Sequence, residues 1–161
     1  MAETRRHFVR ATMTGAVAGA ATASSYSQIL GANDRIRLGL IGYGLIGAFH
    51  VKTYKRHADA QWVAASDVYA PRLEAAKADC GPQCKGYPDF RALLDAKDID
   101  AVVVATPDHW HALHTMLACE AGKDVYVEKP MTLFVKEGRW MTTIARRFNR
   151  IVQVGTQGRS A

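Results

Sequence analysis

From residue 35 onward, short apolar runs alternate with longer stretches in which apolar residues recur at helical spacing. The runs with strand character are 35–42, 61–67, 100–106, 124–128 and 151–155. Helical character follows over 46–57, 71–79, 108–121 and 135–149, and a further apolar run covers 88–96. This alternation predicts a parallel sheet of five strands with helices on both faces, the doubly wound α/β or Rossmann class.

The strongest strand, 100–106 (DAVVVAT), shows no polar alternation, as expected for a strand covered on both faces. In sheets of this class, ligands bind outside the carboxyl ends of the strands. The residues that follow each strand are therefore the candidate site.

The first strand ends in a glycine-rich turn with the pattern G-x-G-x-x-G, at Gly42, Gly44 and Gly47. The first glycine permits the tight turn, the second lets backbone N–H groups approach a pyrophosphate, and the third lets helix and strand pack closely. The helix that starts here adds the positive end of its dipole. The strand, turn and helix in sequence predict a dinucleotide site.

The second strand ends in Asp67, twenty residues after Gly47. A carboxylate at this spacing can accept hydrogen bonds from the adenosine ribose hydroxyls. Because it would repel a 2′-phosphate, Asp67 favours NAD over NADP. Arg72 lies nearby and keeps NADP open as a second cofactor.

Polar and aromatic groups follow the strand at 100–106, in the segment Thr106–His111. We expect Asp108 to be a helix N-cap, Trp110 to be a core residue and His114 to be structural. His109 and His111 form a His-x-His pair, but it lacks the further ligands of a metal centre, so we expect no metal site.

The fourth strand ends in Glu128-Lys129-Pro130. A lysine there can stand near a reacting alcohol and serve as proton donor or base. Pro130 could follow a cis peptide bond and hold the turn. Lys129 is the candidate catalytic residue.

The segments GYGLIG (42–47), ATPDHWHALHTMLACEAGKDVYVEKP (105–130) and QVGTQGRS (153–160) carry a specific resemblance. Through them, residues 35–161 resemble the N-terminal nucleotide-binding domain of the glucose-fructose oxidoreductase, inositol dehydrogenase and rhizopine-catabolism family (Gfo/Idh/MocA). Members of this family exchange hydride between a nicotinamide cofactor and a sugar or cyclitol.

The resemblance implies a role for each matching residue. The three glycines, with Leu45 and Ile46, would cradle the pyrophosphate, and Asp67 would hold the adenosine ribose. The residues implied on the nicotinamide side are Thr106, Pro107, His111, Glu128 on the ribose, Lys129 near the substrate hydroxyl, and Gln157, with Arg159 in the segment beyond it.

The family also has a second α/β domain, which supplies the substrate pocket and often the oligomer interface. We expect that domain to be absent from these 161 residues. A homo-oligomer is then expected only for a longer form. The absence leaves open whether the 161 residues alone are an enzyme.

Residues 1–34 have the layout of an export signal. A basic segment with Arg5, Arg6 and Phe8 precedes a weakly apolar run and the small-residue site Ala21-Thr22-Ala23. The arginine pair followed by x-Phe resembles a twin-arginine signal. The apolar run is too short to span a bilayer. We therefore expect export, with the twin-arginine machinery as a partner and a periplasmic location, or a cytoplasmic one if this interpretation fails.

Cys80 and Cys84 are close enough in sequence for a small-loop disulfide in an oxidising compartment, and two unpaired thiols are the alternative. The chain carries 21 Lys and Arg against 15 Asp and Glu, a net charge of +6. This excess is scattered and is not interleaved with aromatic residues, so we expect no nucleic-acid partner. An apolar fraction of 48% excludes a disordered chain.

The sequence thus predicts the NAD(P)-binding domain of an exported oxidoreductase acting on a sugar, cyclitol or related polyol. Two alternatives stay open. One is a glycoside hydrolase that uses NAD transiently, and the other is a dinucleotide-binding module without catalysis.

Overall fold

A computed structural model of the chain describes residues 35–159, so the expected export signal at 1–34 lies outside the described residues. The strands are β1 (Ile36–Ile41), β2 (Ala60–Ser66), β3 (Lys85–Tyr87), β4 (Ala101–Val104), β5 (Asp124–Glu128) and β6 (Val152–Gly155). They form one sheet in the order β3-β2-β1-β4-β5-β6, and every neighbouring pair is parallel. This confirms the doubly wound class, with the order reversing between β1 and β4.

The prediction of five strands was wrong, because β3 makes a sixth. It has only three residues, Lys-Gly-Tyr, and it lies at the edge of the sheet. A glycine between two polar-tipped side chains gives no apolar run. Strand β3 forms because its backbone pairs with β2 from Ala64 to Ser66.

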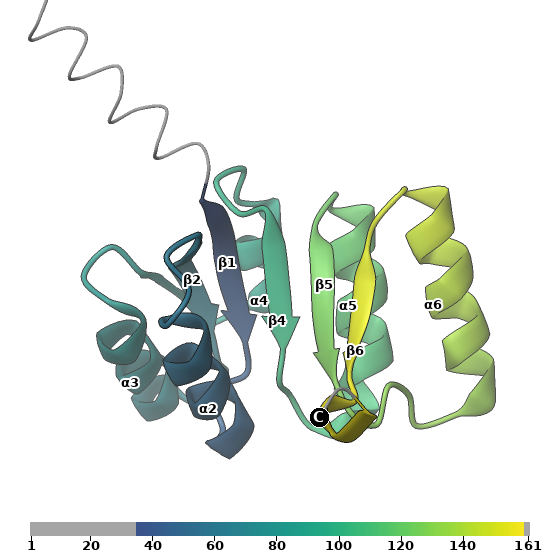
Figure 1. The fold of residues 1–161 in the computed structure, drawn as a ribbon, viewed down its shortest axis with the longest axis horizontal. Coiled ribbons are helices and arrows are strands. Elements are labelled where there is room, and N and C mark those ends of the chain that lie inside the picture. Colours follow the sequence, from purple (N-terminus) through teal and green to yellow (C-terminus); the bar gives the residue numbers. More distant parts are fainter. Residues whose placement is uncertain (1–34, 160–161) are drawn as a thin grey trace, which may run out of the picture. The chain divides into compact units, whose positions relative to one another are not determined.

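Helices cover both faces of the sheet (Figure 1). Helices α2 (Leu45–Tyr54) and α3 (Ala70–Cys80) lie on one face, and α4 (Phe90–Asp95), α5 (His111–Glu120) and α6 (Val135–Arg147) lie on the other. Two short 3₁₀ helices, η1 (Asp108–Trp110) and η2 (Gln157–Arg159), follow β4 and β6. The arrowheads of the strands point to the edge where η2 lies (Figure 1).

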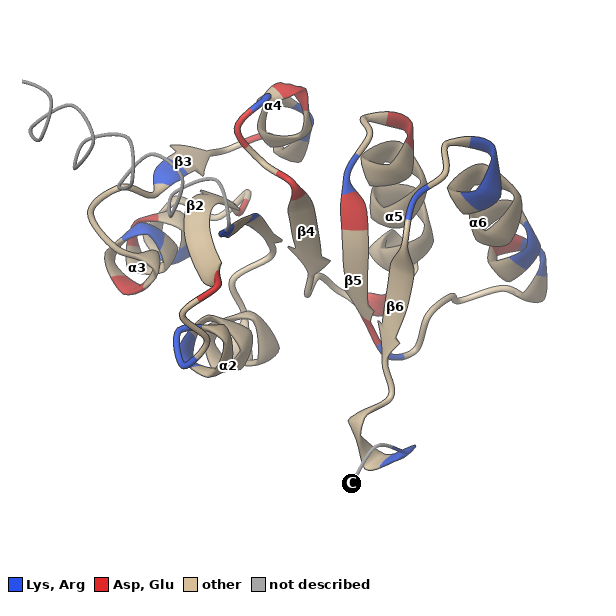
Figure 2. Cartoon of the chain, turned by 45° about the horizontal axis from the view of Figure 1, so that its top comes forward, with Lys and Arg blue, Asp and Glu red and all other residues tan. Residues whose placement is uncertain are grey.

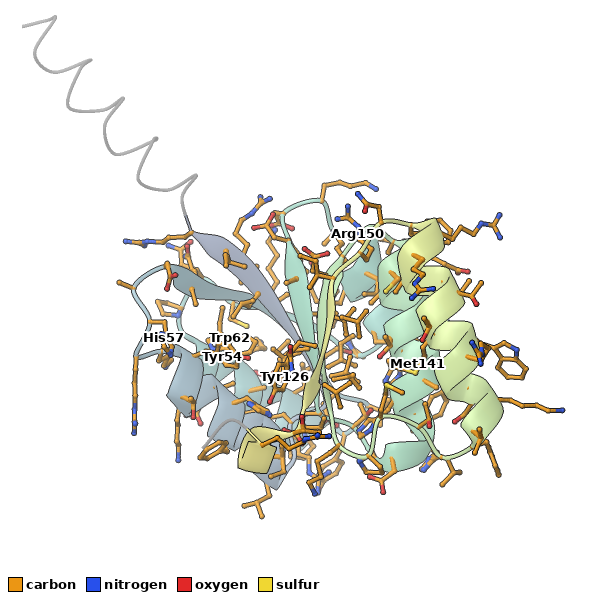
Figure 3. All side chains as sticks on the ribbon, turned by 45° about the vertical axis from the view of Figure 1, so that its right-hand side comes forward. Tyr54, His57, Trp62, Tyr126, Met141 and Arg150 are labelled. Carbon is orange, nitrogen blue, oxygen red and sulfur yellow. The ribbon has the colours of Figure 1, made fainter. Side chains whose placement is uncertain are left out.

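Each face has its own apolar core. Val51 of α2 and Leu73 of α3 pack with Leu40 and Trp62 on one side, and all four are buried. On the other side Leu93, Ala118 and Met141 bring α4, α5 and α6 onto the sheet. Figure 3 shows Met141 and the Tyr54, Trp62 and Tyr126 group in these separate places. Burial of a large apolar side chain contributes about 1.5–3 kcal/mol, so these contacts hold the helices on the two faces of the sheet. The edge at the carboxyl ends of the strands is left open.

Several helix ends differ from the expected ones. Helix α2 stops at Tyr54 because the N–H groups of Arg56 and His57 bond to carbonyls three residues back, which tightens the last turn. The segment after β4 starts as η1, and α5 begins only at His111. Asp108 is not an N-cap, because no side chain caps η1 or α5. Gly122 follows α5 with φ +78°, a left-handed conformation that ends the helix.

Cys80, Cys84 and Cys119 are buried free thiols, so the structure has the unpaired alternative. Lys and Arg are spread over α3, α4 and α6, with acidic residues between them (Figure 2). Within residues 35–159, no helix combines the length and the apolar character needed to cross a membrane.

Candidate functional site

The glycine-rich turn between β1 and α2 has three glycines with three different environments. Gly42 has φ +92°, and a Cβ there would lie 2.9 Å from the Ala105 carbonyl oxygen. A Cβ on Gly47 would lie 2.3 Å from the Gly42 carbonyl oxygen. These two positions need glycine for the fold itself, as the motif predicts.

Gly44 differs, because a Cβ built there would meet no atom of the described chain within 4 Å. Its backbone, with φ −92° and ψ −161°, is extended, and other residues adopt it. Nothing in the fold requires glycine at this position. The open space in front of Gly44 fits a group that approaches the backbone at the N-terminus of α2, as a pyrophosphate does.

Asp67 is held beside this turn by two backbone donors. The Tyr43 N–H donates to Oδ2 at 2.8 Å, and the Tyr69 N–H donates to Oδ1 at 2.9 Å. The Tyr43 hydroxyl in turn donates to Asp79 of α3. Burial, followed by this hydrogen bond, raises the pKa of Tyr43 to about 12. The carboxylate is therefore fixed relative to the turn before any ligand is present.

A cavity of about 300 Å³, here called the lysine cavity, opens at the carboxyl edge of the sheet. It is lined by ten of the predicted residues: Gly42, Gly44, Leu45, Ile46, Asp67, Thr106, Pro107, His111, Glu128 and Lys129. Arg72, Ala105 and Asp108 complete the lining. The predicted residues outside the lining are Gly47, which is buried under the turn, and Gln157.

Glu128 is buried in the wall of the lysine cavity. Its Oε1 lies 2.7 Å from His50 Nε2 and accepts from Gln157 Nε2 at 2.9 Å, while Oε2 accepts from the Lys129 N–H at 3.0 Å. Burial would raise the pKa of Glu128, but the hydrogen bonds from His50, the Lys129 N–H and Gln157 outweigh it and hold the pKa below its usual value. Glu128 is therefore an ionised anchor for the turn that carries Lys129.

His50 lies among aromatic rings that exclude water from its contact with Glu128. Its ring centroid lies 5.1 Å from that of Tyr126 and 6.0 Å from that of Tyr54. The Tyr54 ring lies beside both Tyr126 and Trp62 on this side of the sheet (Figure 3). Gln157 also donates to the Tyr126 hydroxyl, at 3.0 Å.

Lys129 itself is exposed in the lysine cavity, and none of the described residues accepts a hydrogen bond from its Nζ. The Lys129–Pro130 peptide bond is cis, as the sequence suggested. The Pro130 carbonyl oxygen lies 2.7 Å from Nδ1 of His111. The ammonium group is thus free to meet a substrate, while the backbone on both sides of it is held.

A second cavity of about 460 Å³, here called the aromatic cavity, adjoins the first. The two share Gly42, Asp67, Arg72, Thr106 and Pro107. The aromatic cavity extends to Phe90, Trp110 and His114.

The ring of His114 is buried and stacks on Trp110 at 5.3 Å, with the Phe90 ring edge-on at 4.3 Å. Burial, with the positive charges of His111 and Arg91, lowers the pKa of His114 to about 4. The prediction of Trp110 as a core residue was wrong. Trp110 is 39% exposed, because η1 turns its side chain to the cavity wall.

Sequence reasoning missed Phe90, His50 and Tyr43 as parts of the site. Phe90 lies just after β3, whose sequence carries no strand pattern, so nothing in the sequence marked the end of β3 as part of the site. Recognition of Lys85–Tyr87 as a strand would have pointed to the Pro88–Arg91 segment. Tyr43 acts through its backbone N–H, which donates to Asp67. His50 acts through its contact with Glu128, 78 residues away in the sequence. No local sequence pattern shows either contact.

No group of three or more His, Cys, Asp or Glu in the described range 35–159 gathers as metal ligands do. Both ring nitrogens of His111 face carbonyl oxygens, so the His-x-His pair has no free nitrogen at His111 for a metal. The edge of the sheet instead offers a glycine cradle, a fixed carboxylate, an aromatic wall and a lysine. Together these fit a dinucleotide with a reacting group at one end.

Comparison with known proteins agrees with this geometry. Residues 36–156 match the family described as "Oxidoreductase family, NAD-binding Rossmann fold" (Gfo/Idh/MocA). Inositol 2-dehydrogenase of Klebsiella pneumoniae subsp. pneumoniae is 35% identical over 122 residues, covering 74% of this chain and 36% of that protein. A glycosyl hydrolase family 109 protein of Shewanella is 28% identical over 159 residues, covering 83% and 35%.

Solved structures show the same fold. The WlbA dehydrogenase from Bordetella pertussis in complex with NADH and UDP-GlcNAcA superposes with a TM-score of 0.74 at 28% identity, over 78% of this chain and 36% of that one. The apo scyllo-inositol dehydrogenase from Lactobacillus casei gives 0.74 at 28%, over 80% and 38%. The chain spans about a third of the length of these relatives. The family match over 36–156 and the geometry of the site agree: this chain belongs to the Gfo/Idh/MocA oxidoreductase family and forms its NAD-binding Rossmann fold.

Proposed function

We propose that this chain is the nicotinamide-nucleotide-binding part of an oxidoreductase that acts on a hydroxyl carbon of a sugar, cyclitol or related polyol. The single observation that carries the proposal is the open space at Gly44, at the N-terminus of α2 and on the wall of the lysine cavity. The fold has no use for a missing side chain there, whereas a dinucleotide pyrophosphate needs it.

Each half of the dinucleotide has a place in this proposal. Gly42, Gly44 and the backbone of Leu45 and Ile46 receive the pyrophosphate, and Asp67 receives the adenosine ribose. The nicotinamide half occupies the lysine cavity. The fixed carboxylate of Asp67 favours NAD over NADP, because it repels a 2′-phosphate. Arg72 lines the same cavity and could pair with that phosphate, so NADP stays a second possible cofactor.

The nicotinamide cofactor, when bound, supplies hydride transfer. The task of the chain is then to bind, orient and move a proton. Lys129 is exposed in the cavity and can hand a proton to, or take one from, the substrate oxygen. Glu128, on the nicotinamide-ribose side, keeps the backbone N–H of Lys129 in place through Oε2.

The substrate class comes from the relatives. One relative is an inositol 2-dehydrogenase, and another is a dehydrogenase crystallised with NADH and UDP-GlcNAcA. Both inositol and the sugar of UDP-GlcNAcA are polyhydroxylated rings. Since this chain spans about a third of each, we assign only the class, a polyhydroxylated ring or chain.

The similarity to the glycosyl hydrolase family 109 protein, which covers 83% of this chain, favours a second candidate. That candidate is a glycoside hydrolase, in which bound NAD would supply a transient oxidation of the sugar, and water would replace the leaving group with no net NADH.

One experiment separates the two candidates. The chain is incubated with NAD and a panel of inositols and sugars while NADH absorbance is followed, and in parallel with NAD and chromogenic glycosides. Accumulation of NADH supports the dehydrogenase. Release of the chromophore without net NADH supports the hydrolase. Saturable NAD binding with neither product would favour a dinucleotide-binding module without catalysis, and no saturable NAD binding would overturn the proposal.

We further propose that residues 1–34 direct export by the twin-arginine route and so give a periplasmic location. The support is the order of Arg5-Arg6, Phe8 and the Ala21-Thr22-Ala23 site in the sequence. A reporter fused after residue 34 should reach the periplasm, and replacing both arginines by lysine should keep it in the cytoplasm. Export that survives the double substitution would refute the twin-arginine route.

A further inference from the structure

His111 makes two contacts that one neutral imidazole cannot both satisfy. Its Nδ1 lies 2.7 Å from the Pro130 carbonyl oxygen, and its Nε2 lies 2.8 Å from the Thr106 carbonyl oxygen. A carbonyl oxygen only accepts, so each ring nitrogen must donate a proton. Both nitrogens carry protons only in the imidazolium form.

These contacts join the ends of two neighbouring strands. Thr106 follows β4 and Pro130 follows β5, while His111 is the first residue of α5 and is only 1% exposed. Lys129 precedes Pro130, and its N–H is held by Glu128. His111 therefore holds the backbone immediately after Lys129, the cation that the proposed chemistry uses.

Charged groups of both signs surround this position. The ionisable groups that share the lysine cavity with His111 are three carboxylates and two cations: Asp67, Asp108, Glu128, Arg72 and Lys129. On the side of α2, His50 lies against Glu128. On α5 itself, His114 is the nearest titratable neighbour, and burial keeps it neutral at pH 7, with its pKa lowered to about 4.

We propose that His111 is a positioning residue, kept as an imidazolium, whose two N–H groups tie the Lys129–Pro130 turn to the end of β4. In this way it sets where the Lys129 side chain stands in the lysine cavity. The charge state rests on the two carbonyl contacts alone. Only the consequence for Lys129 rests on the proposed function.

The first test needs no ligand. Nitrogen NMR of the full chain with ¹⁵N-labelled histidine, at pH 7, reports the protonation of each ring nitrogen, and the spectrum of His111→Gln identifies the His111 signals. We expect protons on both nitrogens of His111, and one bare nitrogen on His114, the internal control. A bare nitrogen on His111 at pH 7 would overturn the proposal, because one of the two contacts would then be mere proximity.

The second test separates positioning from general support of the fold. NAD and ADP are each titrated into the wild type, into His111→Phe, and into His57→Phe, whose histidine is exposed on the loop after α2 (Figure 3). Phenylalanine cannot donate to either carbonyl, so Thr106 and the Glu128-Lys129 segment, which line the nicotinamide side of the lysine cavity, are no longer tied together. We expect this displaced wall to weaken NAD binding about tenfold in His111→Phe, about 1.4 kcal/mol, and to leave ADP binding within about twofold. His57→Phe should change neither.

Equal weakening of NAD and ADP by His111→Phe would mean that His111 only supports the fold, which overturns the positioning role. A wild type that binds neither ligand would refute the proposed function instead. The NMR result would still decide the state of His111 in that case.

Discussion

The backbone N–H of Tyr43 donates to Oδ2 of Asp67 at 2.8 Å, linking the glycine-rich turn after β1 to the end of β2. Since the Tyr69 N–H holds Oδ1, both oxygens are placed by the backbone before a ribose arrives. An acceptor that is already oriented loses little entropy when it binds a ligand. The relationship explains why Asp67 stands at the junction of the two cavities.

Asp67→Asn should separate the charge of this residue from its hydrogen bonds. The amide oxygen can still accept from the Tyr43 N–H, but hydrogen bonds to a neutral acceptor are weaker by about 1 kcal/mol, so NAD affinity should fall about fivefold. NADP should lose less, because the repulsion of its 2′-phosphate disappears. Calorimetric titration of both nucleotides measures the ratio. An unchanged ratio would contradict the selection of NAD by the charge of Asp67.

Lys129→Met should spare cofactor binding and remove turnover. The Lys129 side chain is exposed and makes no hydrogen bond to the described chain, so its loss should leave the NAD dissociation constant within about threefold. Any wild-type turnover with a polyol should become undetectable, because the proton donor is gone. The same preparation serves for fluorescence titration and for the NADH assay. Loss of binding that parallels the loss of turnover would refute the separate roles.

The Glu128 carboxylate should give the fold a specific sensitivity to acid. Its pKa is depressed in the folded chain from the usual 4.5, so its stabilisation is fully present above pH 4.5 and is lost as the pH falls through the lower folded value. Urea unfolding between pH 6 and about pH 3 should show a steeper loss of stability in the wild type than in Glu128→Gln.

The other carboxylates with lowered pKa values, Asp98 and Asp100, are the same in both proteins and cancel in this comparison. If the free energy of unfolding fell with pH in parallel for the wild type and Glu128→Gln, the buried contact between His50 and Glu128 would add nothing to stability.

Lys123 should stabilise the opposite end of the sheet. Its buried Nζ donates to the Ala96 and Ile99 carbonyl oxygens at 2.6 and 2.9 Å. Lys123→Met leaves both acceptors without this donor and should lower the free energy of unfolding by about 2 kcal/mol. Lys97→Met, at an exposed position nearby, should cost less than about 0.5 kcal/mol. Equal urea midpoints for the two variants would contradict this role.

The parts of the site that could be predicted from the sequence are those whose residues are neighbours in the chain. The run from β1 through Gly47 carries strand, turn and helix start together, and Glu128-Lys129-Pro130 follows a strand directly. Asp67 was found because its distance from Gly47 is characteristic of the class. Each of these signals is local in the sequence, and the folded structure has the predicted strand, turn or carboxylate at that position.

The parts that could not be predicted depend on contacts made only by folding. The contact between His50 and Glu128 joins α2 to β5, and nothing near either residue marks the other. The partners of His111 are backbone carbonyls, which sequence patterns do not show. Trp110 looked like a core residue because it is apolar, yet it belongs to η1 and lines a cavity.

The most direct test of NAD binding at this edge is calorimetric titration of NAD into the wild type and two glycine variants. Gly44→Ala and Gly158→Ala both add a methyl group in open space, but only Gly44 lines the lysine cavity. Gly44→Ala should cost at most about 1 kcal/mol of stability, because alanine is a poorer N-cap than glycine.

We predict saturable binding to the wild type, an unchanged dissociation constant for Gly158→Ala, and at least about tenfold weaker binding for Gly44→Ala. No saturable binding to the wild type, or full binding by Gly44→Ala, would contradict the account.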